Sequence, residues 1–189
     1  RESGRPVKMV MSYTEELLAA NPRHPTVVKL TTGVKKDGRL TAMKMEIYLN
    51  SGAYGAFKPS QRVDLHGVHQ AGSCYRFSAV DIQSFMIYTN TVPHGHMRSP
   101  GAPQVTFAVE SQLDIIAREL GIDPGELRLR NLVEERDEQV QRRGLHHVRA
   151  KETLQRALEA ADWDKPKPRP FTGRGISMYE RMPGAFGES

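Results

Sequence analysis

The sequence predicts an α+β fold in which a mixed sheet containing a β-hairpin packs against amphipathic helices. Three observations support this class. An Asp-Gly turn signal within residues 36–39 separates two β-rich runs. A long run, residues 105–120, has apolar residues at helical spacing. Strand and helix patterns follow one another in mixed order, and an antiparallel hairpin argues against a purely parallel sheet.

The first half of the chain is expected to be mainly β-structure. Residues 7–11 are a candidate strand, and residues 14–20 a short helix that ends before Pro22. Residues 27–32 and 40–50 form the arms of the hairpin. The second arm alternates in polarity, which predicts one buried face and one exposed face. Its apolar positions are Met43, Met45, Ile47 and Leu49, and its polar positions are Lys44, Glu46 and Tyr48. Residues 79–91 are the next candidate strand.

The second half is expected to be helical. The helix over 105–120 places its apolar and polar residues on opposite faces. The apolar face holds Val105, Ala108, Val109, Leu113, Ile116, Ala117 and Leu120, and the polar face holds Glu110, Ser111, Asp114 and Arg118. Gly121 ends this helix, and Asp123-Pro124 begins another. A third helix, over 151–161, carries Leu154, Ala157, Leu158 and Ala161 on one side.

The expected organisation is one domain over residues 1–164, a Pro- and Lys-rich linker over 165–172, and the start of a further subdomain over 173–189. A new strand is expected to begin near Gly173. The sequence starts without a methionine and stops inside MYERMPGAFGES, so we expect a segment of a longer protein.

Composition narrows the functional classes. The chain has 38% hydrophobic and 26% charged residues, a net charge of +5, and no apolar run long enough to span a membrane. Its basic residues are scattered and not interleaved with aromatic ones, which does not favour nucleic-acid binding. The single cysteine, Cys74, cannot form an internal disulfide, which fits a reducing, cytoplasmic compartment. We expect Cys74 to be a small buried apolar residue.

Two segments are candidate functional sites. Residues 51–73 are rich in glycine and histidine and lack periodicity. The pairs His66/His69 and His94/His96 are of a type that binds zinc, but no acidic residue lies at the spacing of a known zinc motif. The alternative is that these histidines line a polar cleft or lie at the surface. The sequence contains neither a dinucleotide fingerprint nor a catalytic triad motif.

The other segment is HGHMRSPGAPQ, residues 94–104, directly before the long helix. The helix is expected to begin inside it, and a helix N-terminus attracts anions such as phosphate. Arg98 adds a guanidinium group, and Gly95 and Gly101 allow the backbone to approach a ligand closely. The alternative is an ordinary strand-to-helix corner whose arginine is solvated. Both interpretations remain open from composition alone.

The order and spacing of several short motifs resemble the large, molybdenum-cofactor-binding subunit of the xanthine dehydrogenase, aldehyde oxidase and carbon monoxide dehydrogenase family. The resemblance covers almost the whole chain. Its motifs are Gly4-Arg-Pro-Val-Lys8, Arg23-His-Pro25, residues 32–40, Ser51-Gly-Ala-Tyr54, Tyr88-Thr-Asn-Thr91, MRSPGAPQ, Phe107-Ala-Val-Glu110, Ile122-Asp-Pro124, Leu127-Arg128 and Arg130-Asn-Leu132.

This resemblance implies that the loop before the helix lies against molybdopterin. Matched residue by residue, Met97 takes the family's first aromatic position, Arg98 its arginine, and Gly101 a fixed glycine, so these three are the candidate cofactor-binding residues. On the substrate side, Pro100 stands in place of a stacking aromatic residue, and His66 in place of a substrate-polarising arginine. Both departures argue against xanthine as the substrate.

The resemblance also implies an activity, cofactors and partners. The expected reaction is hydroxylation of an aldehyde or an N-heterocyclic or aromatic substrate with water-derived oxygen, by a molybdopterin-dependent oxidoreductase. Partner subunits or domains would carry [2Fe–2S] clusters and FAD, in a dimer of heterotrimers. A glutamine-containing cofactor motif is expected before residue 1 and the general-base glutamate after residue 189. We therefore expect this chain to be inactive alone, with no catalytic residue of its own. The alternative is a stand-alone phosphate- or nucleotide-binding module that uses the 94–104 loop.

Overall fold

The computed structural model describes residues 2–54, 71–72, 74–135, 137, 148–165 and 169–179. Within them the chain forms these elements in order: α1 (Tyr13–Ala19), β1 (Thr26–Val34), β2 (Leu40–Gly52), β3 (Ala79–Tyr88), α2 (Ala102–Leu120), α3 (Pro124–Asn131) and α4 (Ala150–Ala160). None of the helices in these ranges is long and apolar enough to cross a membrane.

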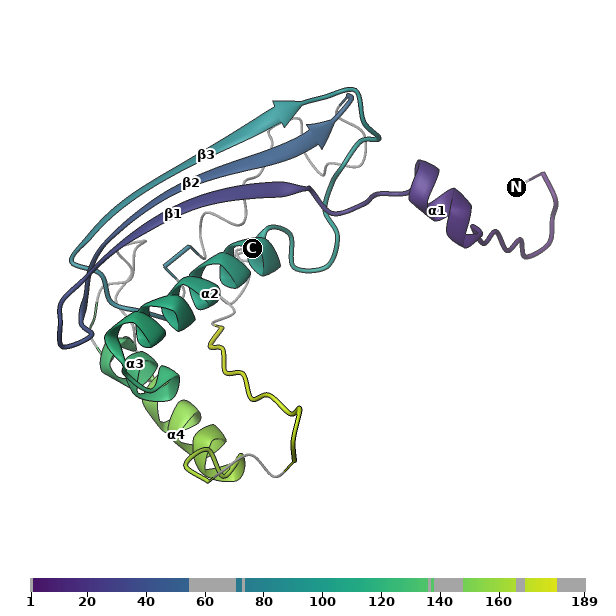
Figure 1. Ribbon diagram of the computed structural model, residues 1–189. Helices are drawn as coiled ribbons and strands as arrows, with labels where there is room; N and C mark the ends of the chain where they lie inside the picture. The colour runs from purple at the N-terminus through teal and green to yellow at the C-terminus, as the bar shows by residue number, and fades with distance from the viewer. Residues whose placement is uncertain are drawn as a thin grey trace.

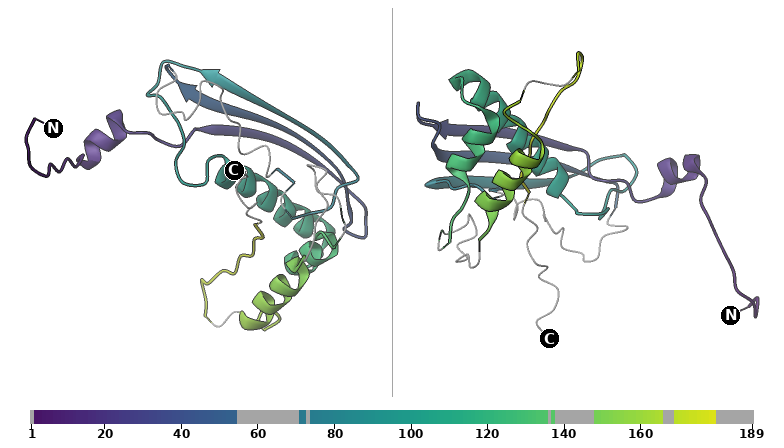
Figure 2. Two further views of the ribbon diagram at one scale, coloured as in Figure 1. Left: turned by 180° about the vertical axis from the view of Figure 1, so that it is seen from behind. Right: turned by 90° about the horizontal axis from the view of Figure 1, so that it is seen from below.

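The three strands form one mixed sheet in the order β1-β2-β3. β1 and β2 pair antiparallel as the expected hairpin, whereas β2 and β3 pair parallel. Figure 1 shows a curved sheet with α2 beneath it and with α3 and α4 continuing away from its hairpin end. α1 projects beyond the opposite end of the sheet, away from the other elements (Figure 2). The expected α+β class with a mixed sheet is confirmed.

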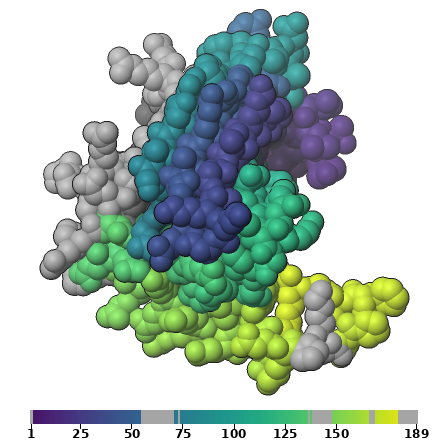
Figure 3. All heavy atoms as spheres, turned by 60° about the vertical axis from the view of Figure 1, so that its left-hand side comes forward, coloured from purple at the N-terminus to yellow at the C-terminus, as the bar shows by residue number. Residues whose placement is uncertain are grey.

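The core lies between one face of the sheet and α2. The alternation in β2 is confirmed, because Met43, Met45, Ile47 and Leu49 are all at most 5% exposed. They meet the buried face of α2, and Leu127, Leu132 and Tyr75 complete the cluster. The lone cysteine, Cys74, belongs to this core, as expected. On the outer face the strands lie side by side at the molecular surface (Figure 3), and the rings of Tyr48 and Phe85 stack there with centroids 5.1 Å apart.

The prediction that Glu110 lies on the polar face of the long helix is wrong, because this glutamate is buried in an ionic network. Its carboxylate accepts hydrogen bonds from Tyr75 Oη at 2.7 Å and from Arg128 Nε at 2.9 Å. Arg128 has no exposed side-chain area and also pairs with Asp114 Oδ1 at 2.8 Å. Burial and the adjacent carboxylate both raise the pKa of Tyr75, so its hydroxyl remains a donor. Burial disfavours the charge on Arg128, but Glu110 outweighs it and the pKa of Arg128 is raised.

Three other local predictions are wrong. Residues 7–11 are exposed and form no strand, because no neighbouring strand pairs with them within the described residues. Ala157 on α4 and Ala161 at its C-cap are exposed, so the apolar contacts of this helix with the core come from the buried Leu154 and the half-buried Ala150 and Leu158. Residues 172–179 form no strand, although Ile176 and Met178 pack against the core.

Helix ends follow the expected capping chemistry. Gly121 ends α2 in the left-handed conformation at φ 65°, and the Asp123 side chain accepts hydrogen bonds from the N–H groups of Gly125 and Glu126 at the start of α3. At the other end of α3, Asn131 donates to the carbonyls of Gly38 and Leu127 and accepts from the N–H of Leu40. The side chain of Asn131 therefore joins the hairpin turn to the helix layer.

Candidate functional site

The loop between β3 and α2 lies at the carboxyl ends of the two parallel strands. β2 ends at Gly52 and β3 ends at Tyr88, and these two residues are register partners. In sheets with parallel strands, ligands commonly bind outside the carboxyl ends of the strands. The segment 94–104 therefore occupies a favourable position for a ligand site.

Side chains from the segment before β1 hold the backbone of this loop. Asn21 Nδ2 donates to the carbonyl of His96 at 2.7 Å. Arg23 uses both terminal nitrogens, which donate to the carbonyls of Arg98 at 2.6 Å and Ser99 at 3.1 Å. A guanidinium fork bound to two successive carbonyls fixes the orientation of both peptide groups.

Further hydrogen bonds tie one end of the loop to β2 and the other end to the segment that precedes β1. The N–H of His94 donates to the carbonyl of Ser51 at 2.9 Å, and Gln104 Nε2 donates to the carbonyl of His24 at 3.1 Å. Gly52, next to Ser51, has φ 69°, and a Cβ on it would lie 2.1 Å from the carbonyl oxygen of Val92. Only glycine fits here, because the backbone at the end of β2 packs directly against the backbone at Val92, just before the loop.

The loop contains two residues with positive φ. Ser99 has φ 54° and Gly101 has φ 75°. A non-glycine residue in this region is strained by about 1 kcal/mol or more and persists where the surroundings hold it. At Ser99 those surroundings include the bond from its carbonyl to Arg23.

The beginning of α2 presents uncapped donors. Gly101 is the N-cap and has no side chain to satisfy the first N–H groups of the helix, and the first turn carries no acidic residue. Residues 89–104 contain neither Asp nor Glu. Among the described residues, no acceptor is present for the guanidinium of Arg98 or for the N–H groups of Met97 and Ser99. The site therefore offers N–H donors and positive charge, a set that suits an anion rich in hydrogen-bond acceptors.

The sequence-predicted residues fall in this loop, except one. Met97 is 50% exposed, and Arg98 is also exposed. Pro100 is half-buried, and Gly101 is buried at the N-cap of α2. His66 lies outside the described residues. Asn21 and Arg23 were not predicted as site residues; the only available signal was the motif Arg23-His-Pro25.

Among the described histidines, His94 and His96 belong to the loop and His24 lies beside it. The rings of His24 and His94 are 6.2 Å apart, and both residues are buried. His24 Nδ1 is 2.8 Å from the carbonyl oxygen of Asn50. Within the described ranges, no group of three His, Cys, Asp or Glu residues is placed to hold a metal ion. His69, like His66, lies outside those ranges.

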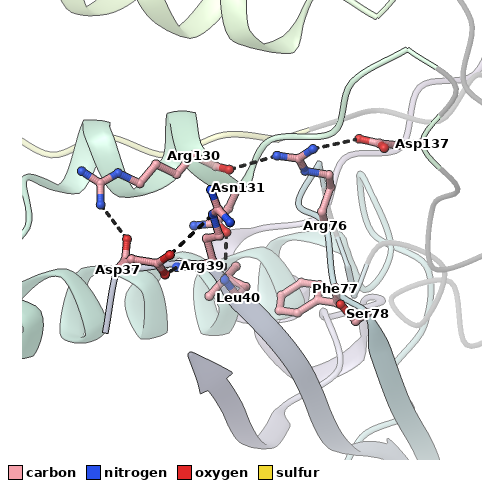
Figure 4. Close-up of a pocket in the computed structure, with 9 residues that line it drawn as sticks. All are labelled: Asp37, Arg39, Leu40, Arg76, Phe77, Ser78, Arg130, Asn131 and Asp137. Atoms are coloured by element: carbon pink, nitrogen blue, oxygen red, sulfur yellow. Dashed lines mark hydrogen bonds and ion pairs between the residues drawn. The ribbon is translucent and has the colours of Figure 1, made fainter. Parts of the chain in front are cut away.

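A cavity of about 790 Å³ lies away from this loop, at the hairpin end of the sheet, between the turn before β2 and the end of α3 (Figure 4). Its three arginines are engaged within the fold. Arg130 binds Glu126 at 2.9 Å and the carbonyl of Asp37 at 2.6 Å, and Arg76 donates to the carbonyl of Arg130 at 3.1 Å. The third, Arg39, lies 3.6 Å from the carboxylate of Asp37. We therefore assign these groups a structural role in joining the hairpin turn to α3.

Residues 1–132 match the molybdopterin cofactor-binding domain. The xanthine dehydrogenase molybdenum-binding subunit of Escherichia coli O157:H7 is 36% identical over 163 residues, covering 86% of this chain and 21% of that protein. The nicotinate dehydrogenase large molybdopterin subunit of Eubacterium barkeri is 35% identical over 127 residues, covering 67% of this chain and 29% of that protein.

Solved structures agree with these sequence relatives. Quinoline 2-oxidoreductase from Pseudomonas putida 86 superposes with a TM-score of 0.76 at 25% identity, covering 86% of this chain and 21% of that chain. The chain thus spans between a fifth and a third of the length of these relatives. On the match over residues 1–132 and on these likenesses, the chain belongs to the molybdopterin cofactor-binding domain family.

Proposed function

We propose that this chain forms one wall of the cofactor site in a molybdenum-dependent hydroxylase, with the loop 97–101 lying against molybdopterin. The observation that carries the proposal is the donor set of the loop. Backbone N–H groups, the uncapped start of α2 and the Arg98 guanidinium all belong to one segment that contains no carboxylate. Molybdopterin is an anionic, acceptor-rich group, so these residues fit it.

The three candidate cofactor-binding residues, Met97, Arg98 and Gly101, each have a part in this proposal. Arg98 would neutralise cofactor charge and donate hydrogen bonds from an exposed position. The N–H groups of Met97 and Ser99 would donate to the same group. Gly101, at φ 75°, permits the turn that brings these donors and the helix start together. When bound, the cofactor would supply the oxidation chemistry and the transfer of water-derived oxygen to the substrate.

Two observations support a substrate class, namely the names of the relatives and one side chain of the loop. The matched relatives are named for xanthine, nicotinate and quinoline. We infer an N-heterocyclic or aldehyde substrate. Pro100 presents a small aliphatic ring where an aromatic residue would stack on a purine, which supports a substrate other than xanthine.

The intact protein would act with electron-transfer partners. We infer [2Fe–2S] and FAD groups on partner subunits or domains, in a dimer of heterotrimers, and a reducing, cytoplasmic location in keeping with the single cysteine. We also infer that the 189-residue chain is inactive alone, because among the described residues we assign donors for the cofactor but no general base.

Metal analysis of the intact protein, purified with its neighbours from cells that make the cofactor, tests the proposal. We expect about one molybdenum per chain, with iron and flavin in the same complex. Arg98→Ala should lower molybdenum content or turnover at least about tenfold, the loss expected when a charged hydrogen-bond donor is removed. Arg118→Ala, an exposed arginine near the other end of α2, is the matched control and should leave both unchanged.

Two results would contradict this assignment. Absence of molybdenum from the intact wild-type complex would reject the cofactor site as a whole. In that case, tight binding of inorganic phosphate or a nucleotide by the purified chain would support a phosphate-binding module instead. Normal molybdenum content and turnover in Arg98→Ala would reject the role of Arg98 alone.

A further inference from the structure

Three carbonyls of the loop are held by side chains of the segment 21–23. Asn21 binds the carbonyl of His96, and Arg23 binds the carbonyls of Arg98 and Ser99. The N–H of Gly95 donates to the carbonyl of Pro22 at 3.2 Å, and a parallel bridge pairs Arg23 with Gly95. Figure 1 shows the chain that enters β1 crossing the connection from β3 to α2 at this point. We call residues 21–23 the strap.

The strap determines where the N–H groups of the loop point. In a planar trans peptide, the carbonyl of one residue and the N–H of the next point in opposite directions. Holding the carbonyl of Arg98 against Arg23 therefore directs the N–H of Ser99 away from the strap. Holding the carbonyl of His96 against Asn21 directs the N–H of Met97 in the same way. The donors proposed to face the cofactor are thus oriented by bonds on the opposite side of the loop.

Resting on the function proposed above, we propose that Arg23 is a positioning residue of the cofactor site, which sets the loop for molybdopterin without contacting it. The chemistry of arginine fits this task. Two terminal nitrogens of one rigid guanidinium reach two successive carbonyls, at 2.6 and 3.1 Å. A lysine has a single nitrogen on a flexible stem, so it cannot fix both peptide groups in one geometry. One of the two carbonyls belongs to Ser99, the residue held at φ 54°.

Two variants of the full-length protein, Arg23→Ala and Arg23→Lys, test this role by two independent readouts. The first is trypsin cleavage of the cofactor-free protein at the Arg98–Ser99 bond. Arg98 is exposed, but the carbonyl of this bond is held by Arg23. Loss of both bonds should speed cleavage there by about tenfold or more, since cleavage follows local opening. Arg23→Lys should fall between Arg23→Ala and wild type.

The second readout is molybdenum per chain after expression in cells that make the cofactor. We expect a loss of about tenfold in Arg23→Ala and a smaller loss in Arg23→Lys. Arg174→Ala is the matched control, because Arg174 also binds backbone carbonyls, those of Asp162, Trp163 and Lys165, near the end of α4. It should leave molybdenum content and cleavage at Arg98–Ser99 as in wild type.

The outcomes separate this inference from the proposed function. Wild-type protein without molybdenum would reject the proposed function, and the positioning role with it, whatever trypsin shows. Wild-type protein that holds molybdenum, with variants that load and are cleaved like wild type, would overturn the role of Arg23 alone. Faster cleavage with normal loading would also overturn it, because the strap would then shape a loop that the cofactor does not need. If Arg23→Ala fails to fold, Arg23→Lys decides by the same criteria.

Discussion

Arg128→Met should be strongly destabilising, because it removes one partner from a buried ion pair. Arg128 has no exposed side-chain area, and Glu110 is 6% exposed. Breaking such a pair by removing one charge costs about 3–5 kcal/mol, since the remaining charge is left without compensation. That is a large part of the roughly 5–15 kcal/mol by which a domain is normally stable.

The double variant Glu110→Leu/Arg128→Met should be more stable than Arg128→Met alone. It removes both buried charges, and Asp114, whose side chain is 47% exposed, can return to water. The hydroxyl of Tyr75 then loses its acceptor, at a cost of about 1–3 kcal/mol. Arg156→Met, which breaks an exposed pair with Glu152 on α4, is the surface control and should cost about 0.5 kcal/mol or less.

Urea unfolding of the 189-residue chain measures these differences, with the fluorescence of Trp163, the only tryptophan, as the probe. Its indole N–H donates to Asp123 at 2.9 Å, so the probe reports on the helix that carries Arg128. A loss no larger in Arg128→Met than in Arg156→Met would refute the reasoning. If the loss of stability in the double variant equals the sum of the losses in Glu110→Leu and Arg128→Met, the two charges act independently.

Three further predictions concern the loop, the hairpin and α4. Gly52→Ala should lower the stability by about 2 kcal/mol or more and lower molybdenum loading, because Gly52 has φ 69° and an added Cβ would collide with the carbonyl of Val92. Gly175→Ala is the control, since the space around Gly175 is open, and it should change neither the thermal midpoint nor the loading. Asn131→Leu should cost about 1–3 kcal/mol in urea unfolding by leaving the buried N–H of Leu40 without an acceptor, and an unchanged midpoint would contradict this. A hydrogen bond and the positive charge of Lys151 lower the pKa of Glu134 below 4.5, so the stabilisation by this pair is present above pH 4.5 and is lost as the pH falls through the lower, folded-state pKa. Carboxyl NMR titration should show this depressed pKa, and Lys151→Gln should return it toward 4.5; an unchanged value would exclude Lys151 as its cause.

The fold could be predicted where local patterns decide it. Polarity alternation in β2 and the Asp-Gly turn specify the hairpin, and helical periodicity specifies α2. The burial of Glu110 could not be predicted, because its partner Arg128 is 18 residues away and no local pattern distinguishes a buried, paired carboxylate from an exposed one. For the same reason residues 7–11 have the composition of a strand but lack a neighbour to pair with.

The loop proposed as the site could be picked out from the sequence, but the hydrogen bonds that support it could not. Arg98 and Gly101 stand out locally, as a cation and a glycine before an amphipathic helix. Asn21 and Arg23 hold that loop through bonds to backbone carbonyls, which can be provided by any residue type and therefore leave no pattern in the sequence at the accepting positions. The parallel pairing of β3 with β2, which brings both carboxyl ends to the loop, also depends on contacts distant in sequence.

The strap also determines when, during folding, the loop can take its shape. Its hydrogen bonds join residues 75 and 76 positions apart, whereas the hairpin joins near neighbours. Contacts between distant positions pay a larger loop-closure entropy and form late. Pulse-labelling hydrogen exchange should therefore show protection of the Gly95 amide, bound to Pro22, only after the amides of the hairpin; simultaneous protection would exclude this order. For the cofactor site proposed above, this order means that the loop becomes able to bind the cofactor only after the hairpin has formed.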